Sequence, residues 1–276
     1  KLDIIDLASI SEVAKANHIP LIVDNTVPTP FLLSPKEFGA DIIIHSLTKY
    51  IGGHGSSLGG IVIDSGTFDW GNGTFEEFNT SRPEYYHGLN LFEAVGNLAF
   101  LVKLRIEGLR DFGAAISPLN AFQILQGLDS LSVRIKQHSD NALALAKWLE
   151  SKEEVAWVNY PGLESSKYSH LKDKYLPNGQ SGLVTFGLHS GFEGAKQLTD
   201  GCELFSLVAN FGETKSLIIH PASTTHQQLN EEQQASTGVT PDLIRLSVGL
   251  ENLSDLQADI TQALEKVESY AVADTY

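Results

Sequence analysis

The chain has 276 residues, of which 42% are hydrophobic and 19% charged, which is ordinary for a globular protein of one or two domains. Its formal net charge of −15 argues against nucleic acid or an anionic membrane surface as a partner, and we expect neither a membrane span nor a signal peptide. The one cysteine, Cys202, excludes an internal disulfide framework, is expected to be a small buried residue, and indicates a reducing compartment, which we expect to be the cytoplasm.

The first elements predict a sheet with short connecting helices. The chain starts without methionine and inside a secondary-structure pattern, so we expect an incomplete chain whose N-terminal part is missing. Residues 11–18 are expected to form the end of a helix. Aliphatic runs predict buried strands at residues 21–25, 41–46 and 59–66, and residues 34–39 a short capped helix. Continuous aliphatic strands of this kind predict a sheet covered on both faces, and hence an α/β fold.

The rest of the chain predicts a long excursion and then a second α/β unit. Residues 70–90 are rich in glycine and aromatic side chains, residues 91–109 are predicted to be helical, and a helix that begins at SPLNAF is predicted to extend to about residue 150. After residue 151, strand-like segments such as VAWVNYPG, GLVTFGLHSG and LIRLSVGLE alternate with helical ones. We place a domain boundary near residue 132, inside the long helix.

Charged and hydroxyl side chains follow the predicted strands. The strand LIVD ends on Asp24, and DIIIHSLTK leads to Lys49, at the strand ends where α/β sheets bind ligands. From position alone, the alternative to a ligand-binding role is that Asp24 and Lys49 form a structural ion pair. Ser46, Thr48 and Gly52–Gly53 offer hydroxyls and backbone N–H groups to a phosphate, although GGHG alone is a weak signal and no P-loop motif is present.

A lysine beside phosphate donors, with a carboxylate on the neighbouring strand, meets the needs of pyridoxal 5′-phosphate. The lysine would form an imine with the aldehyde, and the aspartate would hold the pyridine nitrogen protonated. The motifs VDNT and SLTKYIGGHG together resemble the Cys/Met-metabolism family of PLP-dependent enzymes of fold type I, over residues from about 21 to 264. The resemblance implies an aspartate aminotransferase-like fold: residues 1–132 would be part of the PLP-binding large domain, truncated at its N-terminus, and residues 133–276 the smaller C-terminal α/β domain.

The resemblance also implies roles for individual residues. Lys49 would be the Schiff-base lysine, Asp24 would pair with the pyridine nitrogen, and Ser46 and Thr48 would bind the phosphate. No role is assigned to His54.

A second cluster of candidates lies in the C-terminal half. Arg245 interrupts the apolar run LIRLS and needs an anionic partner, since an unpaired buried charge is costly. Pairing with a protein carboxylate is the alternative to a bidentate clamp on an amino-acid carboxylate. The resemblance assigns that clamp to Arg245, helped by Thr225, and a site-lining position to Asn210, where many relatives have serine. We expect no metal, because His220 and His226 lack further ligands at metal-binding spacing.

Two features favour the sulfhydrylase members of the family over its cystathionine γ-synthases and methionine or cystathionine γ-lyases. One is the excursion with RPEYYHGLN and the helix after it, and the other is the segment ANFGETKSLIIHPASTTHQQL with Asn210. The implied activity is a transferase reaction of methionine biosynthesis: γ-replacement on O-acetyl-L-homoserine by sulfide or a small thiol, which gives L-homocysteine or methionine and acetate.

The resemblance further implies a dimer of dimers with shared active sites. The family's N-terminal part carries a glycine-rich phosphate loop, an aromatic residue that stacks on the cofactor, and an arm that reaches the neighbouring subunit. None of these is in this sequence. A non-catalytic fragment, or a partner in an assembly, therefore stays open as the alternative to an enzyme.

Overall fold

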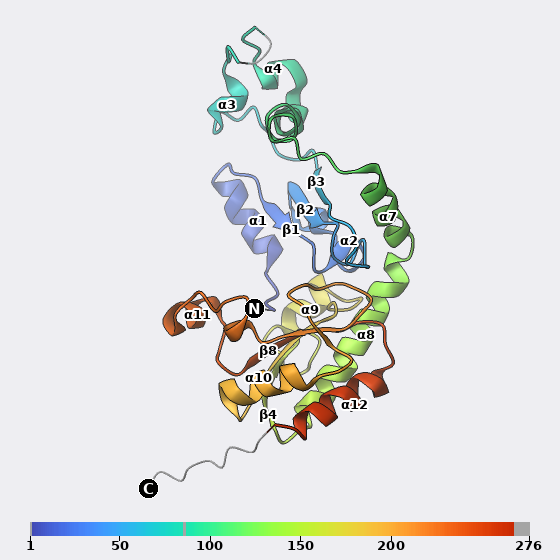
Figure 1. Cartoon of the computed structure of the whole chain (residues 1–276). Helices are drawn as coiled ribbons and strands as arrows, with labels where there is room; N and C mark the ends of the chain where they lie inside the picture. The colour runs from blue at the N-terminus through green and yellow to red at the C-terminus, as the bar shows by residue number, and fades with distance from the viewer. Residues whose placement is uncertain (1, 85–86, 268–276) are drawn as a thin grey trace.

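The computed structural model describes residues 2–84 and 87–267, which form two sheets with helices around them (Figure 1). A three-stranded sheet lies in the N-terminal half and a five-stranded sheet in the C-terminal half. Helices α7 (Pro118–Asp129) and α8 (Leu131–Glu150) run along one side of the molecule and connect the two halves. Among the described residues, no helix has both the length and the apolar character that a membrane crossing requires.

The N-terminal sheet has the strand order β1-β2-β3, with β1 parallel to β2 and β3 antiparallel to it. The strands β1 (Ile22–Asp24), β2 (Ile42–Ser46) and β3 (Gly60–Asp64) lie where the aliphatic runs predict them. The helices of this half are α1 (Leu7–Ala16), α2 (Thr29–Leu32) and the 3-10 helix η1 (Pro35–Phe38). The expectation of a sheet covered on both faces is wrong for this chain. Ile22, Ile61 and Ile63 are 40–52% exposed, because they lie on the two edge strands of a narrow sheet.

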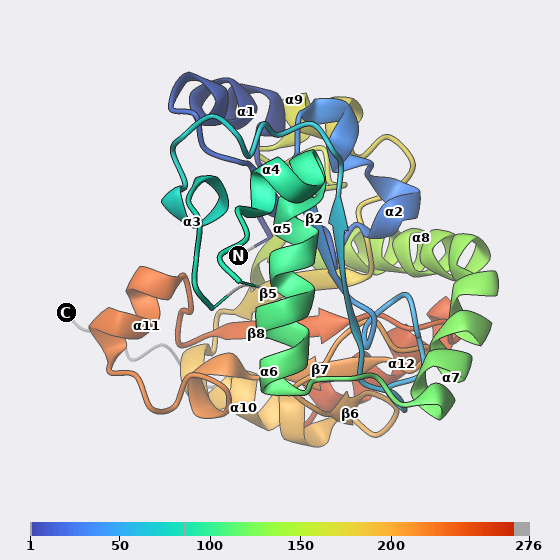
Figure 2. The same cartoon turned by 90° about the horizontal axis from the view of Figure 1, so that it is seen from above.

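The excursion after β3 forms a small aromatic cluster at the far end of the molecule. The Trp70 ring is buried at its centre and stacks on Phe100 with ring centroids 5.0 Å apart. Its helical segments are short: α3 (Glu76–Asn79), α4 (Leu91–Val95), η2 (Gly96–Leu98), α5 (Ala99–Lys103), the π-helical η3 (Leu104–Leu109) and α6 (Arg110–Phe112). Figure 2 shows α5, η3 and α6 as one rod. The predicted helix over 91–109 is interrupted at Gly96, whose φ of 57° no right-handed helix contains.

The helix predicted from SPLNAF to about residue 150 is two helices. Ser117 caps α7 by accepting a hydrogen bond from the Asn120 N–H at 3.1 Å. The break comes at Ser130, with φ −102° and ψ 3°. There the Gly127 carbonyl accepts hydrogen bonds from the Ser130 backbone N–H at 3.3 Å, the Ser130 hydroxyl at 3.2 Å and the Arg134 guanidinium at 2.6 Å, so side chains supplement the last backbone bond of α7. The domain division at residue 132 stays a prediction.

The C-terminal sheet has the order β4-β5-β8-β7-β6. Its strands are β4 (Val155–Asn159), β5 (Leu183–Leu188), β6 (Ser206–Leu207), β7 (Leu217–Ile219) and β8 (Leu243–Ser247). Helices α8, α10 (Gly191–Gly201) and α12 (Leu253–Leu264) supply the largest core cluster with β5 and β8. The sequence analysis did not predict β6, α9 (Ser169–Tyr175), η4 (Pro221–Ser223) or α11 (Glu231–Thr237), which are all short.

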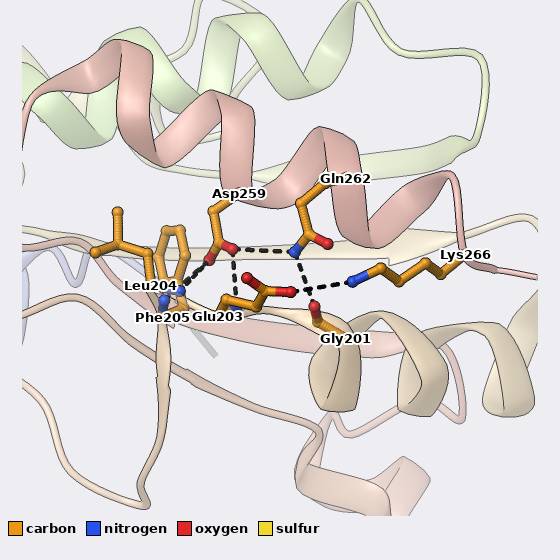
Figure 3. Close-up of polar contacts among 7 residues, drawn as sticks. All are labelled: Gly201, Glu203, Leu204, Phe205, Asp259, Gln262 and Lys266. Atoms are coloured by element: carbon orange, nitrogen blue, oxygen red, sulfur yellow. Dashed lines mark hydrogen bonds and ion pairs between the residues drawn. The ribbon is translucent and has the colours of Figure 1, made fainter.

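A buried carboxylate fixes the turn after α10. Figure 3 shows Asp259 of α12 accepting hydrogen bonds from the backbone N–H groups of Glu203, Leu204 and Phe205, at 2.8–2.9 Å. Gln262 donates to the Gly201 carbonyl and to Asp259, which ties the end of α10 to the same helix. The turn that leads into β6 is therefore held by α12.

Candidate active site

The carboxyl ends of β1 and β2 bring two predicted residues together through a threonine. Asp24 pairs with Ile44 in the parallel register, two residues before Ser46. The Thr26 hydroxyl donates to Asp24 Oδ1 at 2.6 Å and accepts from the Ser46 N–H at 2.8 Å. Asp24 is exposed because β1 is an edge strand, which corrects the expectation that residues 21–25 form a buried strand. No ion pair joins Asp24 to Lys49 in the described part of the chain.

Lys49 lies in a tight turn immediately after β2. The Lys49 carbonyl accepts a hydrogen bond from the Gly53 N–H at 2.7 Å, and Gly53 has a φ of 75°. A Cβ on Gly53 would lie 2.2 Å from the Arg134 guanidinium, which donates to the carbonyls of Tyr50 and Ile51. Glycine is therefore required where α8 holds this turn. The Thr48 hydroxyl accepts from the Gly59 N–H at 3.2 Å, at the other side of the loop.

The Lys49 amine contacts a loop from the C-terminal half. Lys49 Nζ donates a hydrogen bond to Asn210 Oδ1 and lies 4.9 Å from the centroid of the Phe211 ring. Gly212 approaches so closely, with a φ of 79°, that a Cβ there would lie 2.7 Å from the Tyr50 nitrogen. The loop after β6 thus packs directly against the lysine turn.

Arg245 of β8 reaches the same asparagine. Its Nη2 donates to the Asn210 backbone carbonyl at 3.1 Å. The alternative of a structural ion pair is not supported, because no carboxylate lies within 4.0 Å of Arg245 among the described residues. Lys49, Asn210 and Arg245 therefore form one connected cluster across the two halves of the chain.

The electrostatics of the cluster favour an amine that loses its proton readily. Burial lowers the pKa of Lys49, the charge of Arg245 lowers it further, and the carboxylate of Glu213 raises it. Burial also lowers the pKa of Arg245, which stays a cation. A less basic lysine is the form that can act as a nucleophile or base near neutral pH.

Thr225 lies near Arg245 without a hydrogen bond to it. The two residues line one cleft of about 310 Å³, together with Trp157, Asn159 and Thr185. The Thr225 hydroxyl shares a hydrogen bond with His226 Nδ1 at 2.9 Å. In the register of the sheet Asn159, Thr185 and Arg245 are successive partners on β4, β5 and β8, which gives the cleft a polar floor.

His220, His54 and Cys202 show no arrangement for catalysis or metal binding in the described part of the chain. His220 is buried, with its ring nitrogens hydrogen-bonded to the Ser223 hydroxyl at 2.8 Å and the Pro241 carbonyl at 2.7 Å. His54 Nδ1 contacts the Gly52 carbonyl at 2.6 Å. Within the described residues no set of acidic, histidine or cysteine side chains is arranged to hold a metal ion. Burial raises the pKa of Cys202 to about 12, so its thiol is a poor nucleophile.

Comparison with known proteins identifies the family. The profile of "Cys/Met metabolism PLP-dependent enzyme" matches residues 1–265. The chain belongs to this family. An O-acetyl-L-homoserine sulfhydrylase of Leptospira meyeri is 51% identical over 97% of this chain, and O-acetyl-L-homoserine sulfhydrylase 1 of Thermus thermophilus is 46% identical over 95% of it.

A solved structure shares the fold of this chain. It is a crystal structure of a provisionally assigned O-acetylhomoserine (thiol)-lyase of Campylobacter jejuni, which contains N′-pyridoxyl-lysine-5′-monophosphate. It is 46% identical, with a TM-score of 0.91 over 95% of this chain, and confirms the α/β fold that the resemblance implied. The chain spans 62% of the length of the two sulfhydrylases and 63% of the crystallised chain.

The donor set of this chain fits the cofactor named by the family. Lys49 supplies an amine of lowered pKa, and Asp24 a carboxylate that accepts two hydrogen bonds from Thr26 at Oδ1. Ser46 and Thr48 supply hydroxyls next to a glycine-rich turn. Sequence reasoning missed Thr26, which bridges Asp24 and Ser46, and Glu213, which contacts Asn210. The sequence signal for Thr26 was its place in the motif NTV directly after Asp24, and the signal for Glu213 was its place three residues after Asn210.

Proposed function

We propose that this chain carries the lysine and carboxylate-binding parts of a PLP-dependent transferase. It would replace the γ-acetoxy group of O-acetyl-L-homoserine with sulfide or a small thiol, giving L-homocysteine or methionine and acetate in methionine biosynthesis. The observation that carries the proposal is the Lys49–Asn210–Arg245 cluster, in which an amine and a guanidinium converge on one asparagine. The names of the sulfhydrylases of Leptospira meyeri and Thermus thermophilus support the choice of reaction.

The residues divide the work by their chemistry. Arg245 binds the substrate α-carboxylate with its planar guanidinium, and Thr225 lines the same cleft. Lys49, once neutral, takes the proton from the substrate Cα and returns it. When bound, pyridoxal phosphate supplies an aldehyde for the amino group and an electron-withdrawing ring. Asp24 holds the ring nitrogen protonated, and Ser46 and Thr48 donate to the phosphate.

Cofactor attachment can be tested on the chain itself. After incubation with pyridoxal phosphate and reduction with borohydride, we expect mass spectrometry to find the phosphopyridoxyl group on the peptide that contains Lys49. The Lys49→Ala variant should lack this adduct, while Lys215→Ala, an exposed lysine in the same half as Asn210, should keep it. Label spread equally over surface lysines would contradict the assignment of Lys49.

The reaction is tested by product analysis with two substrate pairs. We expect homocysteine from O-acetyl-L-homoserine and sulfide, and little cystathionine from O-succinyl-L-homoserine and cysteine. The reverse preference would indicate a γ-synthase. Both assays are run on this chain and on a longer relative such as the Leptospira meyeri sulfhydrylase, because the chain spans 62% of that protein.

Assembly and location extend the proposal. We infer that the whole protein works in the cytoplasm as a homo-oligomer, a dimer of dimers with shared sites. Exposed apolar side chains along α7, namely Leu119, Phe122 and Leu125, support association, since water-exposed apolar rows favour burial against another surface. Light scattering coupled to gel filtration measures the state; a monomer at every concentration tested would contradict it.

A further inference from the structure

Glu213 is the charged neighbour of the lysine cluster that the proposed function leaves unused. It lies in the loop between β6 and β7, three residues after Asn210, and its Oε1 accepts a hydrogen bond from Asn210 Nδ2 at 2.6 Å. The carboxylate also packs against the lysine loop. A Cβ on Gly55, whose φ is 64°, would lie 2.5 Å from the Glu213 carboxyl carbon.

The orientation of the Asn210 amide follows from what each neighbour can do. A carboxylate only accepts hydrogen bonds, and a lysine ammonium only donates them. The asparagine amide has one end of each kind. With Glu213 on the amide nitrogen, Oδ1 is left facing Lys49 Nζ, and that contact is present. Were the amide reversed, its oxygen would face the carboxylate and its N–H groups the ammonium, and both contacts would be lost.

We propose that Glu213 is a positioning residue, which orients the Asn210 amide so that Oδ1 accepts a hydrogen bond from the Lys49 ammonium. This inference rests on the function proposed for Lys49. Its consequence is that Glu213, through Asn210, sets how readily Lys49 keeps its proton.

The charges around Lys49 agree with this role. From β8, the Arg245 cation lowers the pKa of Lys49, as burial does; from the loop before β7, the Glu213 carboxylate raises it. The Phe211 ring, whose centroid lies 4.9 Å from Nζ, favours the cation through its π face. Glu213 thus opposes Arg245, and its removal should leave Lys49 more often neutral.

The test measures the proton affinity of Lys49 without using the reaction. The full chain is labelled with trace acetic anhydride from pH 6 to 11, with N-acetyl-lysine amide as internal standard, and acetylation of Lys49 is followed by mass spectrometry. In Glu213→Gln the labelling midpoint of Lys49 should move to lower pH, and the rate at pH 7 should rise several-fold. In Glu213→Asp, which keeps the charge, the labelling midpoint of Lys49 should lie closer to the wild-type value. The matched control is Glu232→Gln, which removes an exposed charge on α11.

A double-mutant cycle separates orientation from plain electrostatics. In an Asn210→Ala background, Glu213→Gln should shift the midpoint by clearly less than it does in the wild-type chain. An equal shift in both backgrounds, or no shift in either, would overturn the inference. Circular dichroism checks that each variant is folded, and Gln is chosen because it keeps the shape of Glu. Cofactor attachment to Lys49 is scored separately by borohydride reduction, so a failure here leaves the proposed function standing, and the reverse also holds.

Discussion

At the scale of single residues, the site depends on cations that are half-buried and poorly paired. Arg245 donates to the Asn210 carbonyl and shows no carboxylate partner among the described residues. A guanidinium in that position can bind a carboxylate through two parallel N–H groups. Burial lowers the pKa of Lys49, and the charge of Arg245 lowers it further. If Arg245 binds the substrate carboxylate as proposed, we expect substrate binding and lysine basicity to be coupled.

Replacing Arg245 by lysine tests the clamp. The variant keeps the charge and loses the fork, and one charge-assisted hydrogen bond contributes about 1.5–3 kcal/mol. We expect KM for the amino-acid substrate to rise about tenfold or more, with a smaller change in kcat. Steady-state kinetics on O-acetyl-L-homoserine give the result, with Lys147→Arg, a distant exposed position on α8, as the control. An unchanged KM would remove the clamp from the mechanism.

At the scale of elements, short segments are positioned by side chains from elsewhere. Arg134 holds both the α7–α8 break and the lysine turn, and Asp259 holds the turn after α10. These contacts use backbone groups in turns and at the end of α7. Intrinsic propensity has little influence on such turns, and their geometry depends on the partner side chain.

The Asp259 contacts predict a measurable stability cost. Asp259→Ala leaves three backbone N–H groups of the turn without their acceptor, and we expect the free energy of unfolding to fall by about 3 kcal/mol. Asp259→Asn keeps one acceptor oxygen and should cost less. Urea denaturation of the two variants provides the comparison; Asp255→Ala, on the exposed side of α12, is the control. Equal stability of Asp259→Ala and wild type would contradict the account.

At the scale of the whole molecule, contacts between the halves converge on the lysine turn. The buried Tyr50 hydroxyl accepts from the Gly182 N–H at 3.0 Å, and Thr214 N–H donates to the Gly53 carbonyl at 2.9 Å. His138 of α8 packs edge-on to the Tyr50 ring and contacts the Val248 carbonyl at 2.7 Å. The site therefore lies at the junction of the two sheets, and its geometry depends on their packing.

His138 gives this junction a pH dependence. Burial lowers its pKa from 6.5 to about 4 in the folded protein. The unfolded chain takes up the proton near pH 6.5 and the folded chain does not, so the contribution of His138 to stability falls as the pH drops from about 6.5 to about 4. The loss amounts to about 3 kcal/mol.

The prediction is tested by urea denaturation at several pH values between 7.5 and 4.5. His138→Gln cannot titrate, so its stability should fall less steeply with decreasing pH than that of wild type, whatever its value at pH 7.5. His18→Gln, at an exposed histidine after α1, controls for loss of one histidine. Parallel pH profiles for wild type and His138→Gln would show that His138 is not the group responsible.

The sequence by itself determined most strands, the longer helices and the neighbourhood of Lys49. Aliphatic runs bounded by turn residues are local patterns, and Asp24, Ser46 and Lys49 follow them within 25 residues of one another. Only the tertiary structure decided that Asn210, 161 positions from Lys49, contacts that amine, and that Arg245, 35 residues after Asn210, and Glu213 both contact this asparagine. Packing between sheets leaves no periodic signal along the chain. For the same reason the exposure of Ile22 and Asp24 could not be foreseen, since an edge strand and a central strand have the same pattern of aliphatic residues.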